Sequence, residues 1–261
     1  MLSPRKLLSP GELLNPGELR LERRLVLASA TFVATAVPVA VLAYAATHGW
    51  APLHRLDSGV ADDLHDWTVR QPHAVGFLEG VSTVLHPWVL RAATVGVVAG
   101  LLVRRQRRLA MWLGTTVVAA GLLGLVLKGV VARSRPVLPD PVAHAGGYSF
   151  PSGHALNSFV ILVAFVLVVL PAIPRRWHAA LWGAAAGAVL LVGFARVALG
   201  VHYLSDVVGG WLIGAGLLAV TVIAFETWRR DRGLRVPHVL DEGVDPAASR
   251  ATAGSTGRGT S

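Results

Sequence analysis

Three short stretches of the sequence carry polar residues of the kinds that bind and cleave phosphate esters. In chain order they are Lys128 with Arg135-Pro136, then Ser152, Gly153 and His154, then Arg196, His202 and Asp206. The residues from 109 to 127 that precede the lysine carry no charge, and a lone ammonium group in such an apolar run is costly in a membrane. A charge kept in that setting is typical of a functional site, and together the three stretches indicate a phosphate site.

Cleavage of a phosphate ester without a metal requires cations around the phosphoryl oxygens, a nucleophile in line with the leaving group, and an acid for the departing oxygen. Lys128, Arg135 and Arg196 supply three positive charges, since guanidinium groups bind phosphate oxygens in pairs and an ammonium acts as a point charge. Ser152 and the backbone N–H of Gly153 add neutral donors. Because this turn precedes an apolar helix, its amides and the helix dipole would face an anion.

The two histidines of these stretches have different neighbours and therefore different expected roles. His202 is followed four residues later by Asp206, a spacing that places both on one face if the stretch is helical. The carboxylate can then accept one ring N–H and fix the tautomer, which leaves the other ring nitrogen as nucleophile. His154, directly after the Ser-Gly turn, becomes the candidate general acid.

The sequence contains no Cys and no cluster of metal ligands at ordinary spacing. The chemistry therefore has to come from His, Lys, Arg, Ser and carboxylate groups. We expect no metal site and no cofactor, and activity in the presence of a chelator.

The composition predicts an integral membrane protein. The chain is 53% hydrophobic and only 15% charged, with a mean hydropathy of +0.56, which is too apolar for a soluble globular domain of this length. The net charge of +9 would suit a nucleic-acid partner, but the basic residues lie beside apolar runs and form no single basic face with interleaved aromatics. We interpret them as topology signals and expect no nucleic-acid partner.

A membrane-spanning helix needs about 20 mostly apolar residues, and six segments qualify: about 25–46, 84–103, 109–132, 155–173, 177–198 and 207–227. Pro87 and Arg91 interrupt the second segment, although an arginine near a helix end can extend to the headgroups. The first has a basic flank and an Ala-Tyr-Ala sequence at 43–45, but its apolar core exceeds the 7 to about 15 residues of a cleaved signal. We expect a retained anchor and an all-α, polytopic bundle of six transmembrane helices.

The segment from 52 to 83 predicts an amphipathic helix at the membrane interface on the outer face. Four apolar residues lie at helical spacing with three acids and a histidine between them: Leu56, Val60, Leu64 and Trp67; Asp62, Asp63, His65 and Asp66. We expect this segment to cover the outer face without direct chemistry. Residues 1–24 and 231–261 are expected to be disordered, because of a Pro-Gly-Glu-Leu repeat and a small-residue tail, and they flank a six-span domain over 25–230.

The orientation follows from the positive-inside rule. Basic clusters precede the first span, join the second to the third and the fourth to the fifth, and follow the sixth: Arg5, Lys6, Arg20, Arg23 and Arg24; Arg104, Arg105, Arg107 and Arg108; Arg175 and Arg176; Arg229, Arg230, Arg232 and Arg235. Both termini are therefore expected in the cytoplasm. All three polar stretches then map to the extracytoplasmic face of a plasma membrane.

The three stretches resemble the signature of the type 2 phosphatidic acid phosphatase (lipid phosphate phosphatase) superfamily, in its bacterial six-span membrane form. The matching residues are Lys128, six residues, Arg135-Pro136; Phe150-Pro151-Ser152-Gly153-His154; and Arg196, five residues, His202, three residues, Asp206. The family pattern has a serine before the last arginine, where this chain has Ala195, so one hydroxyl contact to phosphate is missing. The likeness is detailed over 128–206 and looser over 25–230.

The resemblance implies a covalent phosphohistidine at His202, oriented by Asp206, with His154 protonating the leaving oxygen and water hydrolysing the intermediate. The remaining motif residues, namely Lys128, Arg135, Ser152, Gly153 and Arg196, would bind phosphate. Outside the motifs, we expect Arg133 to contact headgroups, and His178 to lie at the cytoplasmic edge. His144 and Tyr148 could line the site, but their spacing assigns them no role.

The expected function is hydrolysis of a lipid phosphate or diphosphate at the outer membrane surface, where the phosphate enters the site while the tail stays in the bilayer. Polyprenyl diphosphate, phosphatidylglycerol phosphate and phosphatidate fit equally well. One alternative is a phosphotransferase that delivers the phosphoryl group to a hydroxyl, and another is a transporter of anions or lipids. Taken singly, Arg196 could instead form an ion pair with Asp206, and His202 could be a packed interfacial side chain.

Overall fold

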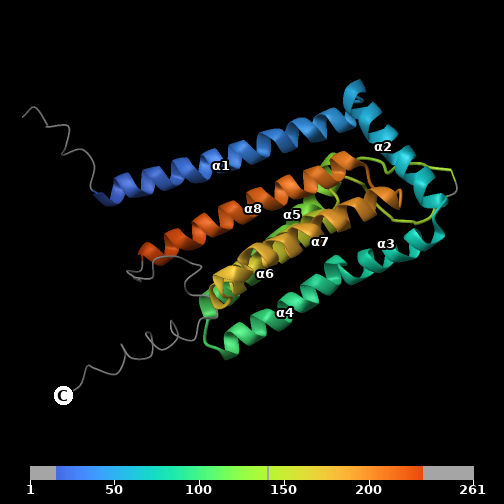
Figure 1. The fold of residues 1–261 in the computed structure, drawn as a ribbon. Coiled ribbons are helices and arrows are strands. Elements are labelled where there is room, and N and C mark those ends of the chain that lie inside the picture. Colours follow the sequence, from blue (N-terminus) through green and yellow to red (C-terminus); the bar gives the residue numbers. More distant parts are fainter. Residues whose placement is uncertain (1–15, 140, 232–261) are drawn as a thin grey trace, which may run out of the picture.

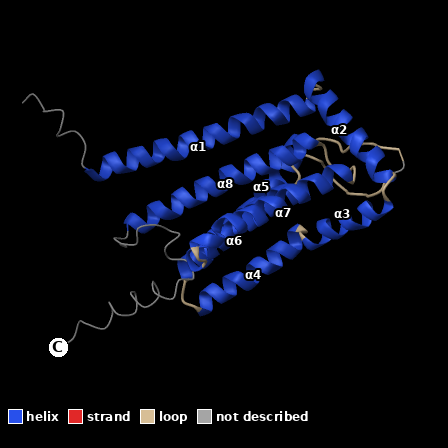
Figure 2. Cartoon of the chain, in the orientation of Figure 1, coloured by secondary structure: helices blue, strands red, loops and turns tan. Residues whose placement is uncertain are grey.

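A computed structural model describes residues 16–139 and 141–231 of the chain. It contains eight α-helices: α1 (Pro16–Thr47), α2 (Ala51–Val69), α3 (Pro72–Val84), α4 (Pro87–Val103), α5 (Arg107–Val131), α6 (Gly153–Val169), α7 (His178–Ala198) and α8 (Leu204–Asp231). Two short 3-10 helices, Leu170–Ala172 and Arg175–Trp177, join α6 to α7. Figure 2 shows helices and loops but no strand in this described part, which confirms the predicted all-α fold.

Six segments within the described ranges are long and apolar enough to cross a membrane, as predicted: Ser29–Thr47, Pro72–Val103, Arg107–Val131, Gly153–Ala172, Arg175–Ala198 and Leu204–Phe225. The second begins earlier than expected, because α3 belongs to this span and not to the interfacial segment. Pro87 starts α4, and the N–H of Trp88 donates to Nδ1 of His86 at 3.2 Å. Proline is well tolerated at this position, where its missing N–H is not needed, so Pro87 divides the span into two helices.

The first helix also extends further than predicted. α1 begins at Pro16, so residues 16–24, expected to be disordered, form its N-terminal part. The Leu, Glu and Arg residues of this stretch favour a helix, and a proline suits its first turn. At the other end, Asp231, the first residue of the tail predicted as disordered, is the last residue of α8. The rest of the termini predicted as disordered, residues 1–15 and 232–261, lies outside the described residues.

The bundle is organised around α6, which contacts α4, α5, α7 and α8. Its buried side chains Leu156 and Ile161 join Leu113 and Ala120 of α5 in the main core. α1 lies along α8 on one side of the bundle, and α4 lies on the opposite side (Figure 1). Large apolar side chains such as Val118 are exposed on the outside, as expected for a surface that faces lipid.

Helix α2 crosses one end of the bundle, between α1 and α3 (Figure 1). The predicted helix is confirmed, but its buried face differs from the predicted apolar one: Leu56 and Trp67 are exposed, whereas the buried positions are Leu53, Asp57, Ala61, His65 and Thr68. Two of these polar side chains reach backbone carbonyls of other segments. Thr68 Oγ1 donates to Ala198 O at 2.9 Å, and His65 Nε2 donates to Pro139 O at 2.6 Å. Specific partners therefore let polar groups occupy the inner face, which hydropathy alone does not reveal.

Close packing of α7 on α8 depends on a glycine. A Cβ at Gly193 would lie 2.4 Å from the ring of Trp211 and 2.8 Å from Val207. Small residues of this kind let membrane helices approach closely. The packing holds α8 against the end of α7. α8 begins within the third polar stretch, which runs from Arg196 to Asp206.

We expect Gly193→Ala to lower the free energy of unfolding by about 1–3 kcal/mol, because a rigid indole ring has to move. Thermal unfolding of the purified protein in detergent measures the effect. Gly187→Ala is the matched control on the same helix, because a Cβ there meets nothing within 4 Å. Equal unfolding temperatures for the two variants would contradict the packing described.

Candidate active site

The residues of the three polar stretches come together at the end of the bundle where α2 lies (Figure 1). They come from the C-terminal end of α5 and the loop after it, the start of α6, the end of α7, and the α7–α8 connection with the first turn of α8: Lys128 and Arg135; Ser152, Gly153 and His154; Arg196; His202 and Asp206. Four segments separate in sequence therefore supply one polar cluster.

The imidazole of His202 faces the carboxylate of Asp206 in the buried part of this cluster. Nδ1 of His202 lies 3.4 Å from Oδ2 of Asp206, and the two residues are 2% and 0% exposed. His202 lies in a loop and not in a helix, since α8 begins at Leu204. Gly200, with a φ of +70°, turns the chain at the end of α7, a conformation that glycine adopts most readily. The i,i+4 pair thus forms across a turn that leads into α8.

The other ring nitrogen of His202 faces a cation. Nη1 of Arg135 lies 3.2 Å from Nε2 of His202, and because a guanidinium can only donate, Nε2 acts as the acceptor. The proton of the neutral imidazole is then on Nδ1, directed at Asp206, and the lone pair is on Nε2. Burial lowers the pKa of His202 from 6.5 to about 4, despite the hydrogen bond and the charge of Asp206. The imidazole is therefore neutral near pH 7.

Three cations of the cluster, including the Arg135 that faces this nitrogen, have no ion-pair partner within the described ranges. Lys128 Nζ donates to Tyr148 O at 2.5 Å. Arg135 donates to the carbonyls of residues 146, 147, 148 and 201. Arg196 is 9% exposed, and its Nε has no hydrogen-bond partner. Because carbonyl contacts leave the positive charges uncompensated, the cluster is suited to an anion with several oxygens.

The Ser152–Gly153 turn connects this cluster to α6. Ser152 caps the helix, its Oγ accepting the N–H of Ala155 at 3.4 Å, and its own N–H donates to Asp206 O at 3.0 Å. Gly153 lies against Lys128, whose Cε would be 4.0 Å from a Cβ at this position. The turn therefore ties the start of α6 both to α8 and to the lysine.

His154 lies on the same side of the bundle as His202. The charges of Arg196 and His202 both act on its ring, and its Nε2 is buried with no hydrogen-bond partner in the described part of the chain. The ring meets that of His86 edge-on, with centroids 4.9 Å apart. A buried nitrogen without a partner is a candidate for exchanging a proton with a bound molecule.

Arg133 departs from the sequence expectation. It was expected at the headgroups, but it is only 7% exposed and bridges two buried carboxylates, with Nη1 2.6 Å from Asp206 Oδ1 and Nη2 2.8 Å from Asp57 Oδ2. Ala132, with a φ of 49°, turns the chain inward after α5. Sequence reasoning also missed Asp57, whose only signal was its place one helical turn from Ala61 in α2.

The remaining polar residues have structural contacts. Arg91, expected to extend to the headgroups, instead donates from Nη2 to Asn157 Oδ1 at 3.0 Å and would meet a Cβ at Gly121. Tyr148 contributes its carbonyl to the cluster. His178 Nε2 donates to Ile173 O at 2.8 Å, near the start of α7 and thus at the opposite end of the bundle (Figure 1). Among residues 16–139 and 141–231, no group of three or more His, Cys, Asp or Glu could hold a metal ion.

Comparison with known proteins adds independent information. The sequence pattern of the PAP2 superfamily matches residues 109–230. Phosphatidylglycerophosphatase B of Bacillus subtilis is 38% identical over 97 residues, which cover 36% of this chain and 46% of that protein. Undecaprenyl-diphosphatase of Sulfolobus acidocaldarius is 31% identical over 158 residues, covering 57% and 71% of the two chains. Lipid A 1-phosphatase of Rhizobium etli is 32% identical over 127 residues, covering 44% and 51%. The chain thus spans about half the length of the first and third of these relatives.

The fold has a solved counterpart as well. The crystal structure of a transmembrane PAP2-type phosphatidylglycerolphosphate phosphatase from Bacillus subtilis matches with a TM-score of 0.67 and 27% identity, over 76% of this chain and 97% of that one. Together with the six apolar spans, this likeness identifies a multi-pass membrane protein. All three of these relatives carry the name of a phosphatase. The matched pattern, the relatives and the shared fold agree with the three motifs, and the chain belongs to the PAP2 superfamily.

Proposed function

We propose that the protein is a membrane phosphatase that hydrolyses lipid phosphates or diphosphates through a phosphohistidine on His202. The observation that carries the proposal is the arrangement around this ring: Nδ1 faces Asp206, while Nε2 faces Arg135, one of three cations that form no ion pair among the described residues. An unprotonated nitrogen beside an anion-binding cluster is the arrangement that a nucleophile for phosphorus needs. Polyprenyl diphosphate, phosphatidylglycerol phosphate and phosphatidate are candidate substrates.

In the first step Nε2 of His202 attacks phosphorus, and the bond from phosphorus to the leaving oxygen breaks. His154 donates a proton to that oxygen, and the charge that develops on the imidazole is stabilised by Asp206. Lys128, Arg135 and Arg196 stabilise the phosphoryl oxygens, with the Ser152 hydroxyl and the Gly153 N–H as neutral donors.

In the second step a water molecule attacks the same phosphorus, and the bond to Nε2 breaks. His154, now unprotonated, accepts the proton of the water, which restores both histidines and releases inorganic phosphate. The charge on phosphate is met throughout by side chains of the protein.

The position of the cluster supports a lipid substrate. Lys128, His154 and Arg196 lie at the ends of apolar spans, so a phosphate in the cluster would sit at the depth of the headgroups while its tail remains in the bilayer. The basic loops between α4 and α5 and between α6 and α7 lie at the opposite end of the bundle (Figure 1). The positive-inside rule then favours an extracytoplasmic site in the plasma membrane, with both termini cytoplasmic.

We expect His202→Ala to reduce phosphate release by more than about 1,000-fold, because the covalent step is lost. His154→Ala should reduce it by about 100- to 10,000-fold. The measurement is inorganic phosphate released from a panel of lipid phosphates by the purified protein, without an added acceptor. His178→Ala, at the far end of the bundle, is the control and should remain active. Phosphate released only when a hydroxyl acceptor is present would identify a phosphotransferase, and lipid uptake that survives His202→Ala would identify a transporter.

The pH profile tests the protonation state of the nucleophile. Because burial lowers the pKa of His202 to about 4 and only the neutral ring can attack, kcat/KM should stay high through pH 5 and fall as the pH drops through about 4. Return of acid-treated protein to neutral pH controls for denaturation. An acidic limb near 6.5, the usual pKa of histidine, would contradict the assignment.

We also expect hydrolysis to be unchanged by a strong chelator, because Lys128, Arg135 and Arg196 supply the positive charge that a metal would otherwise bring. Phosphate release is measured after dialysis against the chelator, with and without added Mg²⁺. Loss of activity that Mg²⁺ restores would overturn this expectation.

A further inference from the structure

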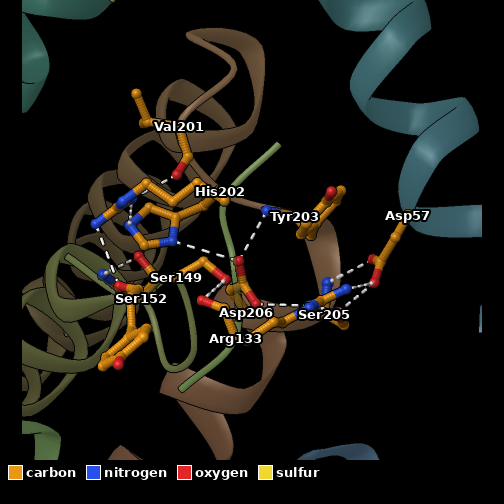
Figure 3. A network of polar contacts seen from close by, with 12 residues as sticks. Asp57, Arg133, Ser149, Ser152, Val201, His202, Tyr203, Ser205 and Asp206 are labelled. Carbon is orange, nitrogen blue, oxygen red and sulfur yellow. Dashed lines mark hydrogen bonds and ion pairs between the residues drawn. The ribbon is translucent and has the colours of Figure 1, made fainter. Parts of the chain in front are cut away.

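A buried network joins α2 to the start of α8 (Figure 3). Asp57 Oδ2 accepts hydrogen bonds from Arg133 Nη2 at 2.8 Å and from Ser205 Oγ at 2.5 Å, and its Oδ1 accepts the backbone N–H of Ser205 at 3.0 Å. Arg133 Nη1 donates to Asp206 Oδ1 at 2.6 Å and to Ser205 Oγ at 2.7 Å. Both carboxylates are 0% exposed. Helix α2, which lies outside the three motifs, is therefore connected through Asp57 and Arg133 to Asp206, the aspartate that faces His202.

The two oxygens of Asp206 are divided between two tasks. Oδ1 accepts from Arg133, while Oδ2 accepts the N–H of Tyr203 at 2.9 Å and lies 3.4 Å from Nδ1 of His202. Because a carboxylate is planar, holding Oδ1 fixes its rotation about the Cβ–Cγ bond and directs Oδ2 toward the imidazole. Arg133 is itself held on its other side by Asp57 and by the ring of Tyr203, 4.2 Å from its Cζ.

The network also sets the charge that acts on His202. Arg133 lies between two buried carboxylates, so its positive charge is shared and does not fully neutralise Asp206. If the charge of Asp57 were removed, Arg133 would pair with Asp206 alone and neutralise more of its negative charge. The surroundings of His202 would then be more positive. Removal of the Arg133 charge would have the opposite effect. The other charged groups that act on His202 are Arg135 and Arg196. His154 also interacts with its ring, and Lys128 acts on Asp206, Arg135 and Arg196.

Asp57 is not the only contact that holds α2 in place. Thr68 and His65 donate to the carbonyls of Ala198 and Pro139, and Leu53 and Ala61 are buried on the same face. A substitution of Asp57 that keeps its size should therefore leave α2 docked. What it removes is the negative charge opposite Arg133 and one of the two acceptor oxygens that serve Arg133 and the first turn of α8, where backbone N–H groups lack partners within the helix.

We propose that Arg133 and Asp57 are positioning residues of the reaction: through Asp206 they orient and polarise His202, so that the docking of α2 aligns the nucleophile. This inference rests on the proposed function, and neither residue contacts the phosphate in it. Their loss should therefore lower kcat and leave KM unchanged.

The test compares Asp57→Asn and Arg133→Gln with wild type, using purified protein, one lipid phosphate and phosphate release from about pH 2.5 to 8, a range that extends below the His202 pKa of about 4. We expect each variant to lower kcat at neutral pH by about 10- to 100-fold, as is usual when a group that orients a functional side chain is lost. The pH at which activity falls on the acidic side should be lower in Asp57→Asn, because more positive surroundings lower the pKa of His202. It should be higher in Arg133→Gln, where the surroundings become more negative. A role in folding alone predicts no opposite shifts.

Asp63 is an exposed acid on the same helix, so Asp63→Asn is the matched control. It should leave both kcat and the acidic side of the pH profile unchanged. If Arg133→Gln does not fold, Asp57→Asn decides the question, since α2 keeps its other contacts. Unchanged kcat in Asp57→Asn, or limbs that move in the same direction, would overturn the proposal. Wild type without activity, or an active His202→Ala, would instead overturn the proposed function.

Discussion

Charge buried in an apolar bundle has to be matched, and the way in which it is matched divides this site into two parts. Arg133 has carboxylates on two sides at 2.8 and 2.6 Å, so its charge is used within the protein. Within the described part of the chain, Lys128 and Arg135 contact carbonyl groups and Nε of Arg196 has no partner, so the charge of these three side chains suits an anion. His202 lies on the boundary, with one nitrogen toward each part.

The backbone maintains this division. The N–H of Ser152 bonds to the carbonyl of Asp206, which ties the start of α6 to the start of α8. This approach requires Gly210, where a Cβ would lie 3.0 Å from the carbonyl oxygen of Ser152 and 3.1 Å from the N–H of Leu156. The donors of the turn and the carboxylate that faces His202 are therefore held by one contact between helices, and movement of either helix would disturb both.

Features that depend on residues close together in the sequence could be predicted, whereas features that depend on residues far apart in the sequence could not. Hydropathy reports on runs of about 20 residues, so the six spans were predicted, and the His202–Asp206 pair lies within one turn. The hydropathy of α2 predicted a helix but the wrong face, because the inner face is made by polar groups whose partners lie far along the chain. Arg133 and Asp57 are 76 residues apart, and neither residue indicates the other. Their pairing arises only when α2 folds across the end of the bundle.

The hydrogen bonds and charges around Asp206 explain why the buried face of α2 carries an acid, Asp57, at a position where an amphipathic helix would have an apolar residue. Asp206 has two oxygens, and in the proposed mechanism one of them must serve His202. A cation is needed to hold the other oxygen in a buried setting, yet a cation paired with Asp206 alone would reduce the negative charge that the imidazole requires. A second carboxylate beyond the cation resolves this conflict. Arg135 faces the other nitrogen of the ring, and Asp57 of α2 occupies the position from which it reaches both Arg133 and the first turn of α8.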